Sequence, residues 1–388
     1  MERLSVSALF SGFKKRINSA SGIDWLLFFA TIPILGAGLL TMNSFVSPNA
    51  LFTRQVYWAV ISLLAFFFLS FIDFRFLRRT AVLVALFLVS VLVLVGLFIV
   101  AREVRGTQSW LTFGGFSIEP VEPIKLVLIL ILAKYFSRRH IEIANIRHIF
   151  VSGFYAFVIF SLVLLQPDFG SAMIIFCIWL GMVTVSGISK KHLAAVFLIL
   201  ALSFAGLWFY VFKDYQKERI HTFLNPLTDI RGAGYNAYQS TIAVGSGGLW
   251  GKGVGLGSQS RLNFLPEYET DFIFAAFAEE WGFVGVVILL GLYSVLIWRI
   301  LVNSMHGATN FEILFGFGLA VFFISHIFIH IGMNIGLLPI TGITLPFASY
   351  GGSHLITEFA GLGILMGMRR YSHAAHKDVV KNEFLGPR

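Results

Sequence analysis

Ten apolar stretches, each long enough or nearly long enough to cross a bilayer, constrain this chain more than any other feature. A transmembrane helix needs roughly 17 to 25 predominantly apolar residues. The mean hydropathy of +0.82 and the 57% share of hydrophobic residues exceed those of an ordinary soluble domain. We therefore predict an all-α, polytopic membrane protein with helices near 24–42, 55–72, 80–100, 121–136, 149–165, 169–187, 192–212, 273–298, 311–332 and 353–368.

The fourth, fifth and tenth stretches are the shortest. Short helices of this kind are expected to tilt little or to begin inside a cavity lined by protein. No internal repeat or low-complexity segment divides the chain, so we expect one membrane domain at 24–370, between an N-terminal segment at 1–23 and a C-terminal tail at 371–388. The first stretch lacks a cleavage site of small residues, which predicts a retained helix.

The basic residues predict the orientation of the chain. Most of the 29 lysines and arginines lie in alternate connections and at the two ends. The positive-inside rule then places both termini in the cytoplasm. The net charge of +9 comes from short clusters between apolar runs, so we expect no nucleic-acid partner. A single cysteine, Cys177, excludes an intrachain disulfide.

The outer side receives the connections of unusual composition. They are the segments 102–123, 166–170 and 334–353 and the long loop 213–272. A loop of that length in a compact protein is usually functional or disordered, and its glycine and aromatic content favours order. We therefore expect the function at the outer face.

Carboxylates at the start of the eighth stretch give the clearest candidate for a functional residue. Between Leu265 and Gly282 an acidic segment runs directly into an apolar one, and a charge there survives only in a water-filled cavity or beside a partner. Asp271 is the candidate catalytic residue, although capping of the helix N-terminus is an equally good reading of its position. Glu279 and Glu280 lie on different faces and are expected to pair with cations of neighbouring helices.

Glycines and cations of the outer side suit a phosphate ligand. The glycine-rich segment 232–257 lacks the Gly-Lys-Ser/Thr signature, which excludes a P-loop, and its glycines fit either a phosphate contact or tight turns. The outer cations suit an anionic or pyrophosphate group, although each could contact a lipid headgroup instead. They are Arg102, Arg105, Lys125, Arg219, Arg231, Lys252 and Arg261.

Two pairs of polar residues lie at helical spacing inside apolar stretches. Glu122 and Lys125 are three positions apart and can form an ion pair. His326 and His330 are four apart on one helical face, a spacing that suits two metal ligands. Since the sequence offers no evident third ligand, we interpret them as structural histidines bonded between helices.

Several motifs, in order along the chain, resemble those of the SEDS family of RodA, FtsW and SpoVE proteins. The match spans nearly everything from the first to the tenth helix, and the sequence between Gly248 and Phe264 is most similar to the elongation members (RodA). Division members (FtsW) commonly carry Ala-His where this chain has Tyr268-Glu269. The motifs are 166–170 (QPDFG), 243–249 (AVGSGGL), 264–267 (FLPE), 270–274 (TDFIF) with Glu279 and Glu280, 334–339 (NIGLLP) and 345–353 (LPFASYGGS).

Three sites depart from the family pattern. The usual Gln-Arg-Trp carries Ser109 in place of its arginine, which removes a candidate phosphate contact that Arg102 or Arg105 could supply instead. The usual Gln-Pro-Ser-Glu reads EPVE at 119–122. His326 and His330 replace a glutamine and an asparagine.

The resemblance implies a peptidoglycan glycosyltransferase that polymerises lipid II at the outer face of the membrane during cell elongation and maintenance of cell shape. It also implies a class B penicillin-binding protein as crosslinking partner, together with other elongation-complex membrane proteins. The partner's single helix would pack on the eighth and ninth helices, where four glycines allow close approach. These are Gly285, Gly291, Gly316 and Gly318.

Glycosyl transfer needs a base for the acceptor hydroxyl and positive charge for the departing pyrophosphate. We expect Asp271 to be the base. Lys125, with Arg231 and Lys252, is expected to stabilise the pyrophosphate, aided by a divalent cation such as Mg²⁺ or Mn²⁺. Further candidates for substrate binding lie in or beside the motifs, namely Glu122, Arg105, Asp168 and Ser353.

Other functions stay open at this point. The chain could be a lipid II flippase, a non-catalytic scaffold for cell-wall enzymes, or a division-type polymerase. A flippase would be expected to line its whole depth with polar groups, and a scaffold needs no buried carboxylates. Polar residues concentrate at the outer end of this chain, which favours chemistry there.

Overall fold

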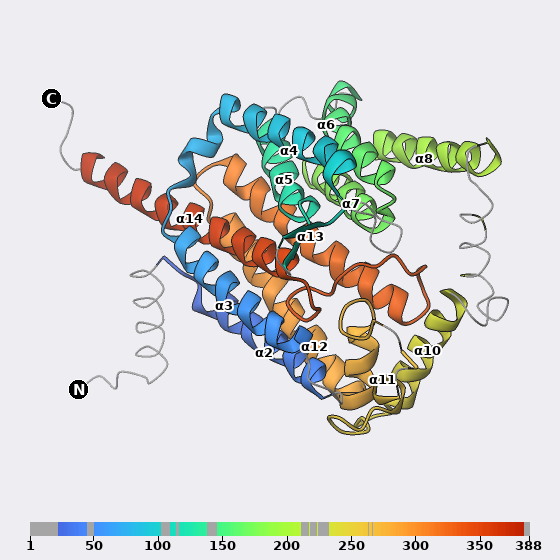
Figure 1. Cartoon of the computed structure of the whole chain (residues 1–388). Coiled ribbons are helices and arrows are strands. Elements are labelled where there is room, and N and C mark those ends of the chain that lie inside the picture. The colour runs from blue at the N-terminus through green and yellow to red at the C-terminus, as the bar shows by residue number, and fades with distance from the viewer. Residues whose placement is uncertain are drawn as a thin grey trace, which may run out of the picture.

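All ten predicted helices are present in the part of the chain that the structure describes (Figure 1). The computed structural model describes residues 22–44, 50–101, 109–113, 116–137, 146–210, 217, 223, 233–262, 264–265 and 267–383. The all-α fold class is confirmed. The helices are α2 (Trp25–Asn43), α3 (Ala50–Ser70), α4 (Thr80–Val100), α5 (Val121–Ser137), α6 (Ile146–Leu165), α7 (Phe169–Val185), α8 (Lys190–Tyr210), α12 (Ile273–Met305), α13 (Asn310–Asn334) and α14 (Gly352–Glu383).

Helix lengths agree with the prediction for α5 but not for α6 and α14. Among the described residues, six helices are long and apolar enough to cross a membrane, namely α2, α3, α4, α6, α12 and α13. α5 and α7 have 17 residues each. The fifth and tenth stretches were expected to be short, but α6 has 20 residues and α14 has 32. Polar turns extend both helices beyond their apolar runs, and α14 continues past position 370 to Glu383.

Several short elements were not predicted. A 3₁₀ helix η1 (Phe74–Arg78) precedes α4, and an antiparallel hairpin of β1 (Leu111–Phe113) and β2 (Phe116–Ile118) precedes α5. The long loop contributes α10 (Ala233–Ser246) and α11 (Ser258–Arg261). The predicted order of this loop therefore holds for the parts that the structure describes.

Helix α13 forms the core of the bundle. It packs against α5, α7, α12 and α14, while α2 lies along α12 and α3 along α14 (Figure 1). Its glycines permit close approach within the chain: a Cβ at Gly318 would lie 2.6 Å from Ile129 Cγ2, and one at Gly316 would lie 2.5 Å from the side chain of Ser304. The expectation that Gly316 and Gly318 receive a partner helix is therefore wrong. On α12, Gly291 does face open space.

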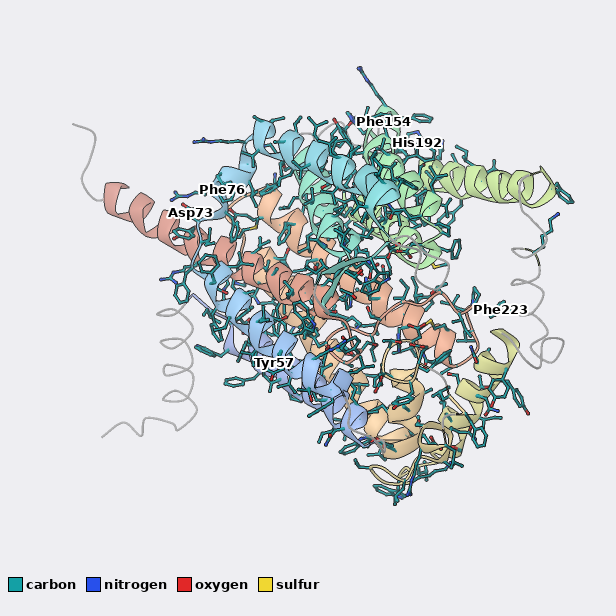
Figure 2. All side chains as sticks on the ribbon, in the orientation of Figure 1. Tyr57, Asp73, Phe76, Phe154, His192 and Phe223 are labelled. Atoms are coloured by element: carbon teal, nitrogen blue, oxygen red, sulfur yellow. The ribbon has the colours of Figure 1, made fainter. Side chains whose placement is uncertain are left out.

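The outside of the bundle is apolar. Large apolar side chains project from α3, α4 and α6, among them Tyr57 and Phe154 (Figure 2). A soluble protein rarely exposes so much contiguous apolar surface. Lipid is the environment that such a surface suits.

Helices α2 and α12 are joined at both ends. Asp24 caps α2 by accepting hydrogen bonds from the backbone N–H of Leu26 and Leu27, and its second oxygen accepts from Arg299 Nε at 2.8 Å and from Asn303 Nδ2 at 2.7 Å. Just beyond the other end of α2, Ser44 donates to Glu280. Gly282 interrupts α12 between these two contacts, close to Glu280. The regular part of the helix from position 283 to Arg299 rises about 24 Å, most of the roughly 30 Å core of a bilayer.

Removal of the Asp24 carboxylate should destabilise this pair of helices. Asp24 is buried, so Asp24→Ala leaves the Arg299 guanidinium without its main partner, and loss of one member of a buried ion pair typically costs about 3–5 kcal/mol. We expect a clearly lower thermal unfolding midpoint in detergent. Asp73→Ala is the control, because Asp73 pairs with Arg75 at the surface and its loss should have little effect. Equal shifts in both variants would contradict the prediction.

Candidate functional site

Asp271 lies in a tight turn just before α12. The carbonyl oxygen of Glu267 accepts hydrogen bonds from the backbone N–H groups of Thr270, Asp271 and Phe272 at 3.1–3.2 Å. The side chain of Asp271 is partly exposed, and a Cβ added to Gly342 would lie 3.7 Å from its Oδ2. Gly342 has φ +72°, a conformation that disfavours any other residue, so a glycine lies next to the carboxylate.

Asn334, at the end of α13, fixes the turn from the other side. Its Nδ2 donates to the carbonyl of Asp271 at 2.9 Å, and its Oδ1 accepts from the backbone N–H of Ala275 at 3.1 Å. One side chain thus supplies partners for two backbone groups at the start of α12. Capping of this helix is done by Asn334, and no side-chain cap from the N-cap residue Phe272 is present.

The irregular segment 339–351 connects the Asp271 turn to α14. Tyr350 N donates to the carbonyl of Glu269 at 2.8 Å, and Ser349 Oγ donates to the carbonyl of Thr270 at 2.8 Å. From α3, Gln55 donates to the carbonyl of Ser349 and accepts from Gly351 N. The turn that carries Asp271 is therefore held against the residues that lead into α14.

A buried cluster of four charged side chains lies between α5 and α14. Lys125 Nζ donates to Glu122 Oε1 at 2.7 Å. The other oxygen of Glu122 lies 2.9 Å from His354 Nδ1, and His354 Nε2 lies 2.8 Å from Glu358 Oε1. Lys125 and Glu358 are fully buried, and Glu122 and His354 are 4% exposed. The cluster links the two helices through four side chains.

His354 lies between two carboxyl groups of this cluster. Its Nδ1 forms a hydrogen bond with Glu122, whereas Nε2 and Glu358 Oε1 lie 2.8 Å apart without the geometry of a hydrogen bond. Glu358 also accepts from the backbone N–H of Phe347 at 2.9 Å, which connects the cluster to the segment 339–351. Buried ionisable groups need such close partners.

His326 and His330 bind the segment 339–351 to α13. Nδ1 of His330 lies 2.6 Å from the carbonyl oxygen of Ile343, and Nδ1 of His326 lies 3.3 Å from that of Thr344. A nitrogen that faces a carbonyl has to be the protonated one. Both histidines thus have structural contacts, but to an irregular segment and not to another helix as expected. The Nε2 atoms of both are buried and have no hydrogen-bond partner among the described residues.

One group of side chains within the described residues has the proximity of metal ligands. Donor atoms of Glu122, His326 and His354 lie within 4.8 Å of one another. Mg²⁺ and Mn²⁺ prefer oxygen ligands, whereas this group offers one carboxylate that is already shared by Lys125 and His354. The group therefore does not fit the divalent cation that the sequence led us to expect.

Asp168 and Ser353 lie near this cluster. Ser353 Oγ accepts from the backbone N–H of Glu119, and Ser171 Oγ lies 3.5 Å from Glu119 Oε1. Asp168 caps α7 by accepting from Ser171 N. Burial, with the nearby carboxylates of Glu122 and Asp168, raises the pKa of Glu119 well above its ordinary value. Three carboxyl groups, those of Glu119, Glu122 and Asp168, therefore lie near one another between the starts of α5 and α7.

Lys252 lies apart, in the turns of the long loop. Its Nζ donates to Glu279 Oε1 at 2.7 Å and to Ser258 Oγ at 2.9 Å. Glu279 thus pairs with a loop cation, not with one on a neighbouring helix as expected. Arg105 and Arg231 lie outside the described residues. Burial, with the charge of Glu269, raises the pKa of Tyr268 to about 12, so its phenol stays protonated at physiological pH.

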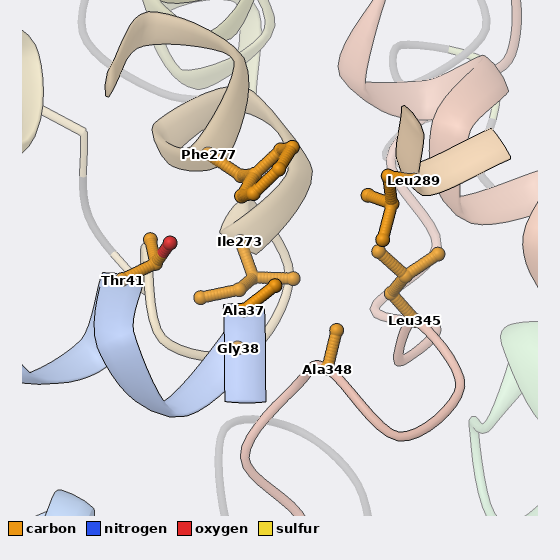
Figure 3. Close-up of a pocket in the computed structure, with 8 residues that line it drawn as sticks. All are labelled: Ala37, Gly38, Thr41, Ile273, Phe277, Leu289, Leu345 and Ala348. Carbon is orange, nitrogen blue, oxygen red and sulfur yellow. The ribbon is translucent and has the colours of Figure 1, made fainter. Parts of the chain in front are cut away.

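A small apolar pocket lies below the Asp271 turn, between α2, α12 and the segment 339–351. It lacks charged residues and offers a single hydroxyl, that of Thr41 (Figure 3). Its volume of about 10 Å³ is too small for a substrate group, so we assign no ligand to it. The residues are Ala37, Gly38, Thr41, Ile273, Phe277, Leu289, Leu345 and Ala348.

Comparison with known proteins identifies the family. The model of the FtsW, RodA and SpoVE family, described as "Cell cycle protein", matches residues 23–374. The chain belongs to this family. The predicted resemblance is thereby confirmed, and the chain is a multi-pass membrane protein.

Named relatives and solved structures agree with this membership. The chain is 37% identical to stage V sporulation protein E of Bacillus subtilis over 90% of this chain and 97% of that protein. It is also 37% identical to peptidoglycan glycosyltransferase MrdB of Escherichia coli, over 76% and 79%.

Two solved structures extend the likeness to the fold. One belongs to a peptidoglycan synthase complex that coordinates polymerization and crosslinking, with a TM-score of 0.79 and 31% identity over 90% of this chain and 98% of that one. The other is the rod shape determining protein RodA of Thermus thermophilus, with a TM-score of 0.68 and 30% identity over 90% and 97%.

The pairing of His354 with Glu358 can be tested by a double-mutant cycle. His354→Gln removes the ring that faces the Glu358 carboxyl group, and Glu358→Gln replaces the carboxyl group that lies 2.8 Å from His354 Nε2. We expect each single variant to lower the unfolding midpoint in detergent. The double variant should lose less than the sum of the two, because contacting residues couple by about 0.5–3 kcal/mol. Strictly additive shifts would show that the two groups do not interact.

Proposed function

We propose that this chain is a peptidoglycan glycosyltransferase that joins lipid II units into glycan strands during cell elongation, with Asp271 as the general base. The observation that carries the proposal is the Asp271 turn, in which a partly exposed aspartate sits on a backbone fixed by Asn334 and by the segment 339–351. The names of the relatives support the reaction class.

In the proposed reaction, the Asp271 carboxylate takes the proton of the acceptor sugar's 4-hydroxyl. The hydroxyl oxygen forms a bond to the anomeric carbon of the donor, and the bond from that carbon to the lipid pyrophosphate breaks with its electron pair leaving on the phosphate. The fixed backbone of the turn orients the carboxylate for this step. The lipid-facing surface suits the polyprenyl part of the substrate.

Stabilisation of the pyrophosphate needs positive charge. Lys125 is buried and bonded to Glu122, so it reaches a phosphate only when this ion pair opens. Lys252 is partly exposed but shared with Glu279. Direct phosphate contacts are therefore assigned, as part of the proposal, to Arg105 and Arg231 on the sequence argument. A divalent cation between phosphate and Asp271 would supply further charge neutralisation.

Asp271→Asn should reduce polymerisation of lipid II by about 10² to 10⁴-fold, the usual contribution of general-base catalysis. Asparagine keeps the shape and the capping ability of aspartate but cannot take up the proton. Glycan strands made by purified protein with its partner in detergent provide the measurement. Asp73→Asn, the same change far from the turn, should leave polymerisation unchanged.

Full polymerase activity of Asp271→Asn would refute the assignment of the base. The assay in detergent also distinguishes a polymerase from a flippase, because a flippase has no membrane to act across in detergent and makes no glycan strands. Wild-type protein that moves lipid II between leaflets but never polymerises it would refute the glycosyltransferase itself.

The Asp271 end of the bundle is proposed to face outward from the cytoplasmic membrane, on the asymmetry of lysines and arginines. Cysteines at 217 and 377, each in a Cys177→Ser background, should differ in reaction with a membrane-impermeant thiol reagent on intact cells. Position 217 should be labelled and position 377 should not. The reverse pattern would invert the topology.

A class B penicillin-binding protein is proposed as the crosslinking partner, with its membrane helix against α12. Gly291 faces open space there, so Gly291→Trp should fill the contact and reduce co-purification of the partner without unfolding the protein. Gly96 of α4 also faces open space, and Gly96→Trp is the matched control that should keep the partner. Retention of the partner by Gly291→Trp would place the interface elsewhere.

A further inference from the structure

Loop 247–257, between α10 and α11, exposes apolar side chains at the end of the bundle that holds Asp271. Leu249 is 65% exposed, Trp250 79%, Val254 49% and Leu256 60%. Loops at an aqueous surface usually carry polar residues at such positions. These side chains therefore need an apolar environment that the described residues do not provide.

Carbonyl groups of this loop accept hydrogen bonds from backbone N–H groups of α12 that have no partner within the helix. Gly282, with φ +64°, interrupts the helix. Phe283 N then donates to the carbonyl of Gly248 at 2.9 Å, and Val284 N donates to that of Leu249 at 3.1 Å. The loop is thus attached at a defined level of α12.

Two further bonds and a close glycine contact fix the loop. Lys252 N and Gly253 N donate to the carbonyls of Glu279 and Glu280, each at 3.0 Å. A Cβ at Gly251 would collide with the carbonyl oxygen of Glu280, so only glycine allows this approach. The hydrogen bonds and the close approach of Gly251 together fix the position of the loop along α12.

This level lies within reach of a bilayer core. Val284 is about 22 Å along the helix from Arg299, which binds Asp24. A hydrocarbon core is about 30 Å thick. Leu249 and Trp250, attached beside Val284, therefore lie at a level of α12 that such a core can enclose.

The polar groups of the loop turn inward. Lys252 bonds to Glu279, and Gly255 N donates to Glu280 Oε1 at 2.8 Å. Next to the loop, α12 exposes Phe283 and Ile288, each 60% exposed, so the apolar side chains of the loop continue a lipid-facing surface. Non-helical backbone is tolerated at membrane depth only where protein satisfies it, and these bonds meet that condition.

We propose that loop 247–257 is a re-entrant segment, with Leu249, Trp250, Val254 and Leu256 immersed in the acyl chains and interface of the adjacent lipid leaflet. Tryptophan favours this zone because its ring is amphipathic. The immersed loop anchors α10, α11 and the Asp271 turn at the membrane surface. A lipid-linked substrate that diffuses in the same leaflet would meet the site at that level.

Spin labels in bilayers test the proposal. In a Cys177→Ser background, single cysteines replace Trp250, Ile288 and Glu267, and each is labelled with a nitroxide in the full-length protein reconstituted into phosphatidylethanolamine–phosphatidylglycerol vesicles. Collision with oxygen reports lipid, and collision with a water-soluble nickel chelate reports water. We expect the ratio of oxygen to nickel collisions at 250 to approach that of 288 on α12 and to exceed that of the exposed turn residue 267 several-fold.

A ratio at position 250 equal to that at 267 would overturn the proposal. So would a label at 250 that is in water in the protein alone and becomes shielded only when the penicillin-binding protein is added, because the occupant would then be a protein. If Trp250→Cys fails to fold, Leu249→Cys reads the same level, and the same two outcomes apply.

Discussion

Buried backbone without regular structure is the constraint on which the rest of this protein depends. The segment 339–351 runs between helices in an apolar environment, where each unsatisfied N–H or C=O is costly. Polar side chains from four helices meet that need: Gln55 from α3, Tyr293 from α12, His330 from α13 and Glu358 from α14. The need to bond this backbone thus explains why apolar helices carry polar residues. The same residues help to position Asp271, because its turn is hydrogen-bonded to the segment 339–351.

The two ends of the bundle are built differently. At the Asp24 end, one carboxylate joins α2 to α12 through Arg299 and Asn303, and the helices there stay regular. At the Asp271 end, Gly282 breaks α12, and both the segment 339–351 and loop 247–257 supply irregular backbone. Irregular backbone offers free N–H groups, turns and partly exposed carboxylates, which regular helices do not. The concentration of candidate chemistry at one end follows from this asymmetry.

The sequence predicted the features that depend on local pattern. Apolar runs located all ten helices, and the acidic segment before the eighth run located the Asp271 turn. It did not predict contacts that depend on which helices face each other, such as His354 with Glu122 across α14 and α5. A signal was available, because His354 and Glu358 are four apart in an apolar run, the same evidence used for Glu122 and Lys125. Gly316 and Gly318 were assigned to a partner helix, but they face inward, because glycine spacing does not tell which face of a helix is covered.

The buried cluster determines what Lys125 can do. An isolated Lys–Glu pair inside a protein is costly to open, because the carboxylate that remains has no partner. Glu122 also binds His354 Nδ1, at 2.9 Å on its second oxygen, so it would keep one partner without the ammonium. Lys125 itself is fully buried and would have to leave its ion pair to reach a ligand. This burial is the physical reason to place the direct phosphate contacts on Arg105 and Arg231, and it gives Lys125 the role of joining α5 to the cluster.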